Sequence, residues 1–217
     1  MELFSRFVAV LMLFIISPLI LFISVGSLVF QGYPVVFKQE RVGFKFQTFF
    51  LYKFRTMKIN NANQLITEAG DKRITQWGNI LRILKLDELP QLWNIVKGDM
   101  RFIGPRPEVS EYVQKQDFLF LNSVKPGLAD FSSILLRNES RILSRAGGKG
   151  KYQKLLEVKV GLGHLYAEHK SFWLDMKLVF LTLVSIFFPK TAVTLVKKFF
   201  IEKHKPDLIP VVNDWIA

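Results

Sequence analysis

The sequence lacks cysteine altogether and is poor in histidine and in acidic residues. Without cysteine the chain can form no disulfide, no thiolate nucleophile and no cysteine-ligated metal centre. The three histidines are scattered, at positions 164, 169 and 204, and their spacing matches no metal-binding motif. Only 18 Asp and Glu stand against 30 Lys and Arg, which gives a formal net charge of +12. The absence of cysteine excludes thiol chemistry. The excess of basic over acidic residues needs an explanation of its own.

The basic charge is combined with high hydrophobicity. Half of the residues are hydrophobic, 21 are Phe, and the mean hydropathy is +0.23. Soluble globular proteins seldom combine these properties, whereas proteins that lie on an anionic membrane surface often do. A basic surface also suits nucleic acid or a phosphorylated small molecule, so charge alone does not choose among these partners.

One stretch of the sequence, residues 7–30, carries no charge. As a straight helix its 24 residues would reach about 36 Å, enough to span a bilayer core. Ser17-Pro18 interrupts the run, and proline favours a kink because its ring presses on the carbonyl of Phe14. Two interpretations remain open: a transmembrane helix that tolerates the proline, or a re-entrant helix with both ends on one side. Basic residues flank both ends of the run and mark neither as the translocated side: Arg6, Lys38, Arg41 and Lys45.

The middle of the chain alternates between strand-like and helix-like patterns. Residues 34–57 are rich in aromatic and β-branched residues and predict a β-hairpin with Gly43 in its turn. The patterns that follow predict, in chain order, a loop or short helix at 58–72, helices at 75–84 and 88–97 (the second ended by Gly98), an extended piece within 98–107, a helix at 107–119 opened by Pro107, and a turn at 125–130.

The C-terminal third of the chain is predicted to be helical. A flexible basic loop is expected at 145–151, followed by a long helix at 152–170 and an apolar helix at 172–188. The last 11 residues of that apolar helix are uncharged, too few to span a membrane. It is therefore either a core helix or an amphipathic helix lying in the membrane interface.

The stretch "LDELPQLW" places two carboxylates, Asp87 and Glu88, at the expected start of a helix that includes Pro90. Acidic residues at helix starts are ordinarily caps, because the unpaired N–H groups and the helix dipole favour negative charge there. The many basic residues nearby favour a second interpretation, since Mg²⁺ binds through one or two carboxylates plus phosphate oxygens, and an ionised Asp can attack phosphorus. Those basic residues are Lys53, Arg55, Arg73, Arg82, Lys85, Lys97, Arg101 and Arg106.

Several motifs in this order resemble those of one family. The chain contains "QERVG", "KFRTM", "RIT-x-x-G-x-x-LR", "KLDELPQLWNIVKGDM", "GPRP" and "KPG". Together, over about residues 1–185, they resemble the bacterial sugar transferases, the monotopic polyprenyl-phosphate phosphoglycosyl transferases, in their short minimal form. The resemblance implies an α+β, mostly helical fold with a re-entrant membrane helix broken at Ser17-Pro18 (residues 1–32). It further implies a compact catalytic domain (33–217) with the β-hairpin and interfacial amphipathic helices.

The resemblance also implies a reaction. Family members move a sugar 1-phosphate from a nucleotide sugar, usually UDP-linked, to undecaprenyl phosphate and release UMP, at the cytoplasmic face of the bacterial inner membrane. Carried over, Asp87 is the nucleophile that forms a covalent aspartyl phospho-sugar, and Glu88 helps to bind Mg²⁺. Membrane lipids are expected partners, nucleic acid is not, and a homodimer is left open. The phosphate contacts expected are Arg106, Arg82, Arg55, Lys53 and Arg101.

Departures from the family pattern bear on specificity. Arg101 stands where many members have Ser, and residues 128–139 differ from the usual pattern and resemble a subgroup with an acidic residue near Glu139. The sugar therefore stays open. A rival interpretation is a membrane-anchored scaffold or nucleic-acid-tethering protein that uses its basic face without catalysis, although here the basic residues are interleaved with the Asp-Glu pair and prolines.

Overall fold

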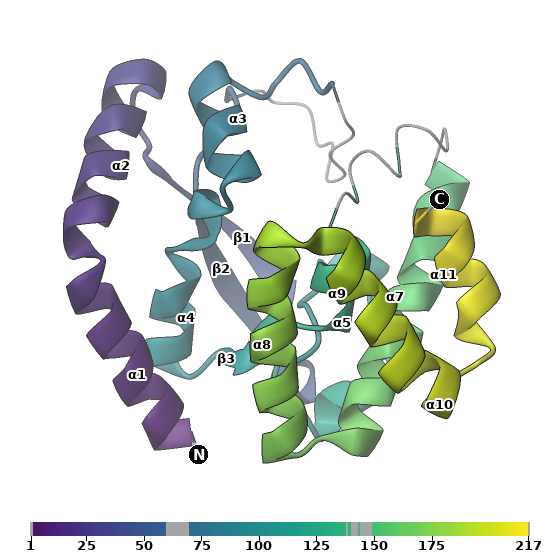
Figure 1. Ribbon diagram of the computed structural model, residues 1–217. Coiled ribbons are helices and arrows are strands. Elements are labelled where there is room, and N and C mark those ends of the chain that lie inside the picture. Colours follow the sequence, from purple (N-terminus) through teal and green to yellow (C-terminus); the bar gives the residue numbers. More distant parts are fainter. Residues whose placement is uncertain (1, 60–69, 138, 140–142, 144–148, 217) are drawn as a thin grey trace. The chain divides into compact units, whose positions relative to one another are not determined.

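The computed structural model describes residues 2–59, 70–137, 139, 143 and 149–216 of the chain (Figure 1). These residues are mostly helical, with two small sheets, as the predicted α+β architecture requires. The chain divides into two compact units: Met1–Arg41 with Thr48–Met100, and Val42–Gln47 with Arg101–Ala217. The Asp-Glu pair lies in the first unit, and the "GPRP" loop lies in the second.

The N-terminal apolar run forms two helices, α1 (Glu2–Ile15) and α2 (Ser17–Gln31), which meet at a bend of 62°. Pro18 has no N–H to donate to the Phe14 carbonyl, and the Ser17 hydroxyl donates to that oxygen instead at 2.8 Å. The Ser-Pro pair therefore both causes the bend and satisfies the backbone acceptor that the bend exposes. No single helix in the described ranges is long and apolar enough to cross a membrane, whereas the bent pair α1–α2 has the combined length and composition for it.

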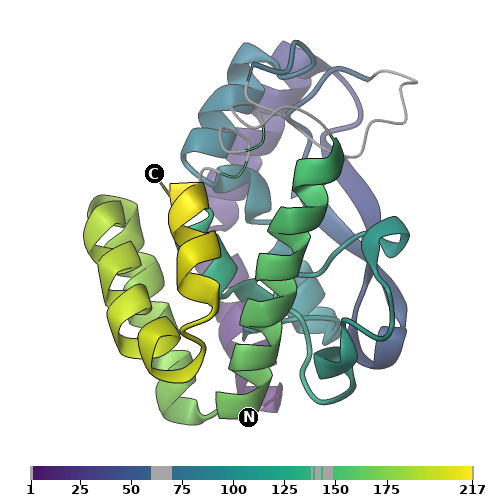
Figure 2. The same ribbon diagram turned by 90° about the vertical axis from the view of Figure 1, so that its right-hand side faces the viewer.

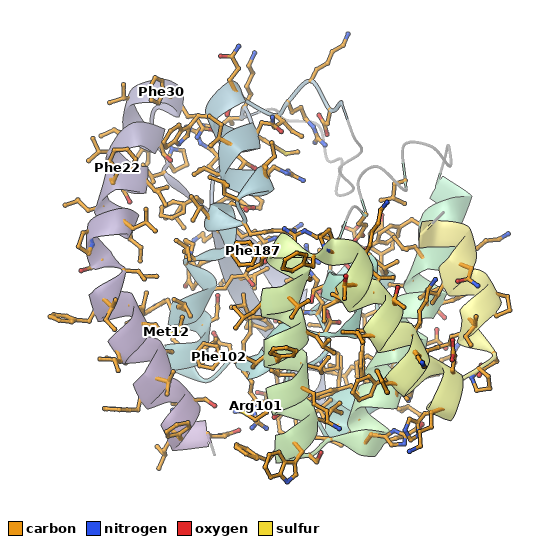
Figure 3. The ribbon with its side chains drawn as sticks, in the orientation of Figure 1. Met12, Phe22, Phe30, Arg101, Phe102 and Phe187 are labelled. Atoms are coloured by element: carbon orange, nitrogen blue, oxygen red, sulfur yellow. The ribbon has the colours of Figure 1, made fainter. Side chains whose placement is uncertain are left out.

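Large apolar side chains on α1 and α2 are exposed. Phe22, labelled in Figure 3, is 68% exposed, while Ala9, Ile23 and Ser27 are buried against the rest of the first unit. One face of this helix pair is thus packed on protein and the other is left bare. The most exposed residues are Leu3, Phe4, Phe7, Phe14, Ile15, Leu21, Phe22, Val29 and Phe30.

The hairpin is present as predicted. Strands β1 (Val36–Val42) and β2 (Thr48–Phe54) are joined by a turn in which the Gly43 N–H donates to the Gln47 carbonyl at 2.8 Å. The predicted helices at 75–84 and 88–97 correspond to α3 (Gln76–Ile83) and α4 (Gln91–Lys97). Gly98 ends α4 in the left-handed conformation (φ +84°), which glycine adopts at no steric cost.

Helix α3 is fixed against α2 by Trp77. Its indole N–H donates to the Ser27 hydroxyl at 3.0 Å, and its ring lies over Gly26, where a Cβ would come within 2.6 Å. Ile23, Phe54 and Leu81 form a buried cluster that joins α2, β2 and α3. The apolar N-terminal segment is therefore part of the same core that supports the hairpin and α3.

The second unit contains a parallel strand pair and the C-terminal helices. Strand β3 (Arg101–Ile103) pairs with β4 (Gly127–Ala129) in the register Arg101–Gly127 and Ile103–Ala129. Figure 2 shows the long α7 with α11 beside it, and Leu208 of α11 packs on Gly161 of α7. The helices are α5 (Phe131–Leu135), α7 (Lys149–His169), α8 (Phe172–Phe187), α9 (Pro189–Val196), the π-helical turn η5 (Lys197–Ile201), α10 (Glu202–His204) and α11 (Leu208–Ile216).

The prediction of a helix at 107–119 is wrong. The chain there is irregular, with short 3₁₀ turns at η3 (Ser110–Tyr112) and η4 (Leu119–Asn122). Within this segment the Glu108 carbonyl accepts from Val42 N–H at 2.9 Å, and just before it the Pro105 carbonyl accepts from Gly127 N–H at 3.0 Å. These long-range partners hold the backbone extended and outweigh the helix-starting tendency of Pro107.

Two predicted loops lie largely outside the described residues. Positions 60–69 of the expected segment 58–72, and 145–148 of the basic loop 145–151, are not described. Lys149–His169 begins slightly before the helix predicted at 152–170, and Phe172–Phe187 matches the helix predicted at 172–188.

Candidate active site

Asp87 and Glu88 lie in a tight turn and not in the first turn of an α-helix, as the sequence had suggested. The 3₁₀ turn η2 (Leu86–Glu88) follows α3 and precedes α4, which begins at Gln91. Lys85 adopts the left-handed conformation (φ +59°) and redirects the chain between α3 and this turn. Because Pro90 has no N–H, the regular i to i−4 bonding of α4 cannot extend back through it, and the preceding turn is wound more tightly.

The Asp87 carboxyl is buried, with only 8% of the residue exposed, and its Oδ1 has no hydrogen-bond partner within the described residues. Burial raises the pKa of Asp87, the charge of Lys53 opposes that rise, and neighbouring Glu88 adds to it. The charges of Lys85 and Arg82 also lower this pKa. A buried carboxylate oxygen without a donor is unusual in a native structure and is typical of a group that meets a ligand.

Lys53 of β2 faces the Asp-Glu pair. Its Nζ lies 3.6 Å from Glu88 Oε1, with both side chains mostly buried. Of the predicted site residues, the structure therefore brings Lys53, Arg82, Asp87 and Glu88 into one electrostatic cluster.

Asn94 holds this cluster together and was missed in the sequence. It is fully buried on α4, accepts the Tyr52 N–H at 3.1 Å and donates to the Phe50 carbonyl at 2.7 Å. These bonds fix α4 to β2, so the strand that carries Lys53 keeps its position beside η2. A buried Asn whose partners are more than 40 residues away gives no signal in a local pattern.

Gln91, the first residue of α4, was also missed. It is 2% exposed, and its Nε2 has no hydrogen-bond partner among the described residues. Asp87 in the turn thus offers a buried acceptor, and Gln91 at the start of α4, four positions later, offers a buried donor. Leaving such groups unpaired costs about 1–3 kcal/mol each, which a bound ligand could recover.

Arg55 occupies a different place from the one expected. It is buried, and its Nη2 donates to the carbonyl oxygens of Gln31 at 2.5 Å and Gly32 at 2.6 Å. The Gln31 side chain donates back to the Arg55 carbonyl at 3.0 Å and accepts from the Thr75 hydroxyl at 2.9 Å. Arg55 thus caps the C-terminal end of α2, where a cation is favoured by the helix dipole. A phosphate contact by Arg55 stays a prediction, and it would share its guanidinium with these carbonyls.

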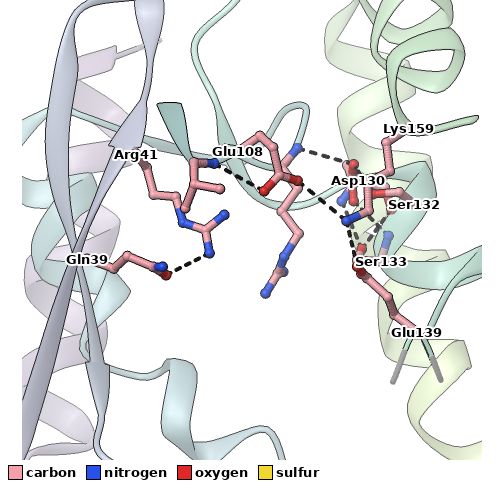
Figure 4. A network of polar contacts seen from close by, with 10 residues as sticks. Gln39, Arg41, Glu108, Asp130, Ser132, Ser133, Glu139 and Lys159 are labelled. Atoms are coloured by element: carbon pink, nitrogen blue, oxygen red, sulfur yellow. Dashed lines mark hydrogen bonds and ion pairs between the residues drawn. The ribbon is translucent and has the colours of Figure 1, made fainter. Parts of the chain in front are cut away.

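Arg106 and Arg101 lie in the second unit. The Arg106 N–H donates to Asp130 Oδ2 at 3.2 Å, so the backbone of the "GPRP" loop is fixed to the start of α5 (Figure 4). Arg101 lies near Asp175, whose pKa is raised by burial; the Tyr166 hydroxyl, which donates to Asp175 Oδ1 at 2.7 Å, and the charge of Arg101 oppose that rise. The phosphate roles of both arginines stay predictions.

The carboxylates of the turn fit a magnesium ion that also binds a substrate. Among the described residues, no three His, Asp or Glu side chains are grouped as a protein-only metal site. Mg²⁺ commonly uses only one or two carboxylates and takes its other ligands from phosphate and water. The unpartnered Asp87 Oδ1 and the adjacent Glu88 carboxylate are donors of this kind.

Residues 1–189 match the family described as bacterial sugar transferase, and the chain therefore belongs to this family. It is 32% identical over 193 residues to the UDP-glucose:undecaprenyl-phosphate glucose-1-phosphate transferase of Escherichia coli (strain K12), covering 85% of this chain and 39% of that protein. It is 35% identical over 185 residues to EpsL, an uncharacterized sugar transferase of Bacillus subtilis (strain 168), covering 83% of this chain and 84% of that protein.

A third relative is named for a different sugar. The UDP-N-acetylgalactosamine-undecaprenyl-phosphate N-acetylgalactosaminephosphotransferase of Aeromonas hydrophila is 32% identical over 185 residues, covering 82% of this chain and 41% of that protein. The chain thus spans about two fifths of the length of the Escherichia coli and Aeromonas relatives. Relatives of equal identity are named for different sugars, so identity does not select a donor for this chain.

Proposed function

We propose that this chain is a phosphoglycosyl transferase that moves a sugar 1-phosphate from a UDP-sugar to undecaprenyl phosphate and releases UMP. The observation that carries the proposal is the buried Asp87 carboxylate, with an unpartnered oxygen, beside the Glu88–Lys53 ion pair. Membership of the bacterial sugar transferase family and the printed activities of the relatives support it.

The proposed reaction has two displacements at one phosphorus. An ionised Asp87 oxygen attacks the β-phosphorus of the UDP-sugar, a new O–P bond forms, and UMP leaves with the electrons of the broken bond to the bridging oxygen. An oxygen of undecaprenyl phosphate then attacks the same phosphorus, and the Asp87–phosphorus bond breaks. The lipid diphosphate sugar is released and Asp87 returns as a carboxylate.

The residues around Asp87 control its charge and the charge of the substrate. Lys53, Lys85 and Arg82 lower the pKa of Asp87 against the effect of burial, which favours the ionised nucleophile. Lys53, which pairs with Glu88, is also proposed to meet a phosphate oxygen. When bound, Mg²⁺ would supply further positive charge to the diphosphate, and Glu88 is the carboxylate proposed to hold it.

The bent α1–α2 pair is proposed to be re-entrant, with the catalytic part at the cytoplasmic face of the bacterial inner membrane. The exposed apolar residues of this pair and the basic charge of the chain support a position at an anionic lipid surface. Arg55 and Trp77 tie α2 to β2 and α3, so the membrane segment and the Asp-Glu turn share one core. Residues 1–32 as membrane segment and 33–217 as catalytic domain stay a prediction.

The topology has a clean test because the chain has no cysteine. Single cysteines at the exposed positions Glu2 and Lys203 are labelled with a membrane-impermeant maleimide in spheroplasts, before and after permeabilisation. For a re-entrant pair both positions stay unlabelled in intact spheroplasts and both label after permeabilisation. Labelling of E2C alone in intact spheroplasts would show that the pair spans the membrane.

The reaction is tested by UMP release from protein in nanodiscs, given undecaprenyl phosphate, Mg²⁺ and a panel of UDP-sugars. The expected result is UMP formation with one donor and its loss when Mg²⁺ is chelated. Omitting undecaprenyl phosphate should leave at most one UMP per protein, because the covalent intermediate then accumulates. If folded protein released no UMP with any donor of the panel, the proposal would be overturned and the non-catalytic scaffold would be favoured.

A further inference from the structure

The turn η2 and helix α4 form one right-handed segment of the first unit. Leu89 and Pro90, which link the two elements, have right-handed helical dihedral angles (φ −55°, ψ −36° and φ −62°, ψ −16°). Leu92 N–H donates to the Leu89 carbonyl at 3.1 Å, so the tight winding of the turn continues into the start of the helix. Asp87 and Gln91 therefore lie about one turn apart, with their backbones separated by about 6–8 Å along the axis.

The two buried atoms of this segment that lack a partner are complementary in character. Asp87 Oδ1 is a carboxylate oxygen and Gln91 Nε2 is an N–H donor, yet neither has a hydrogen-bond partner in the part of the chain that the structure describes, so they do not bond to each other. A ligand that satisfies both must receive an oxygen at one end and accept an N–H at the other. A phosphoryl group does both, because its phosphorus receives the carboxylate oxygen while its own oxygens accept hydrogen bonds.

The donor on Gln91 is neutral, and this suits a position one turn from the nucleophile. Three cations, Lys53, Lys85 and Arg82, already lower the pKa of Asp87. A further cation at this position would hold the carboxylate in an ion pair and compete with the substrate for it. An amide N–H can bind a phosphoryl oxygen without adding to the positive charge around Asp87.

We infer that Gln91 is a substrate-contacting residue: its side-chain N–H donates to a β-phosphate oxygen of the nucleoside diphosphate sugar when that phosphorus lies at Asp87. The inference rests on the proposed function, in which Asp87 attacks this phosphorus. The separation along the segment suits the contact, because one tetrahedral phosphate fits between Asp87 and an N–H···O bond of about 2.7–3.2 Å. The ligand-free protein keeps a buried donor unpaired, and the substrate phosphate is the group that pairs it.

A structural role for Gln91 leads to different expectations. If a buried water bridged Gln91 and Asp87, removing the amide would break a hydrogen bond of the folded protein and lower its melting temperature. Its effect on nucleotide binding would then be the same for ligands with and without a β-phosphate. A contact to the β-phosphate requires the opposite in both respects: no loss of stability in the ligand-free protein, and a binding defect confined to ligands that carry this phosphate.

The test compares calorimetric titrations of UDP and of UMP, each with Mg²⁺, into full-length protein in nanodiscs, a measurement that needs no turnover. Q91M keeps the length of the side chain and removes the donor. It is expected to weaken UDP binding about tenfold, the loss of one hydrogen bond to a charged group, and to change UMP binding less than about twofold. Q91E, which replaces the donor with an acceptor, should weaken UDP binding at least as much.

Thermal unfolding of the ligand-free variants has a matched control in Asn94, a second buried side-chain amide of α4. Its side chain accepts from Tyr52 N–H and donates to the Phe50 carbonyl and to Asp99 Oδ2. N94L breaks these bonds and should lower the melting temperature by about 5 °C or more. Q91M breaks no bond of Nε2, and its melting temperature should stay the same or rise by about 2–4 °C.

The outcomes separate this contact from the proposed reaction. Equal losses for UDP and UMP, unchanged UDP binding by Q91M, no UDP binding by the unmodified protein, or a melting temperature of Q91M as low as that of N94L would each overturn the contact. Should Q91M fail to fold, Q91E carries the comparison, and failure of both to fold would show that the amide is structural. A UDP-selective loss without any UMP release would retain the contact and reject the transfer reaction, whereas UMP release with normal UDP binding by Q91M would retain the reaction and reject the contact.

Discussion

Replacing Asp87 with asparagine is expected to abolish UMP release and, at the same time, to stabilise the protein at neutral pH. Loss of a nucleophile typically costs about 10³-fold or more in turnover. The gain in stability follows because the carboxylate is buried and one of its oxygens has no donor. Removing that charge should raise the melting temperature by about 2–4 °C, which corresponds to about 1 kcal/mol in a chain of this size. Tryptophan fluorescence follows unfolding, since the chain has four tryptophans.

The pH dependence of this gain has a definite sign. Burial raises the pKa of Asp87 above its ordinary value of 3.8, so the folded protein binds this proton more tightly than the unfolded chain does. The penalty of the buried charge is therefore fully present above the raised pKa and disappears as pH falls toward about 3.8. The melting temperatures of D87N and the unmodified protein should converge over that window. UMP release should fall in the same window, because the nucleophile becomes protonated.

Asp99 provides the matched control. It is a carboxylate of the same unit, but it accepts from Lys97 Nζ at 2.9 Å and from Asn94 Nδ2 at 3.2 Å. D99N should therefore lower the melting temperature or leave it unchanged, and should retain most of the UMP release. If D87N were less stable than the unmodified protein at neutral pH, Asp87 would be a structural residue and not a strained nucleophile.

The local features of the sequence predicted the elements whose causes are local. The hairpin follows from alternation around Gly43, the end of α4 from Gly98, and the bend from Ser17-Pro18, where each cause lies within a few residues of its effect. Lys53 could be listed as a site residue only through the family motifs, because Glu88, with which it pairs, is 35 positions away in the chain.

The features that the sequence did not predict depend on contacts between segments that are far apart in the chain. Arg55 looked like a phosphate ligand in "KFRTM", yet its guanidinium is bonded to the end of α2. The helix expected at 107–119 is absent because the Glu108 carbonyl accepts from Val42 N–H, and because the Pro105 carbonyl just before the segment accepts from Gly127 N–H. Lys159 of α7 lies in no motif, and its ion pair with Glu108 forms only once α7 has packed on the "GPRP" loop. In each case the deciding contact joins segments that a local pattern treats separately.

Gly78 is the position where the smallest change should do the most damage to the fold. It lies in α3, where its N–H donates to the Thr75 hydroxyl at 2.9 Å, and its Cα packs directly on the backbone of Thr56. A Cβ there would lie 2.6 Å from the Thr56 Cα and carbonyl carbon, and closer still to the carbonyl oxygen. Backbone atoms cannot rotate away as a side chain can, so G78A must push α3 off the chain that leaves β2.

The expected cost of G78A is about 3 kcal/mol or more, a fall in melting temperature of roughly 6–12 °C. UMP release should fall with it, because α3 leads into Lys85 and the Asp-Glu turn. G161A is the matched control: Gly161 is also helical, but the atoms nearest to its new Cβ would belong to the Leu208 side chain, the closest at 3.0 Å. That side chain can move, and alanine is more favourable than glycine in a helix by about 1 kcal/mol. The melting temperature of G161A should therefore stay within a few degrees of that of the unmodified protein. Equal melting temperatures for G78A and G161A would mean that α3 is not closely packed on Thr56, and that the turn carrying Asp87 is supported by α4 and β2 alone.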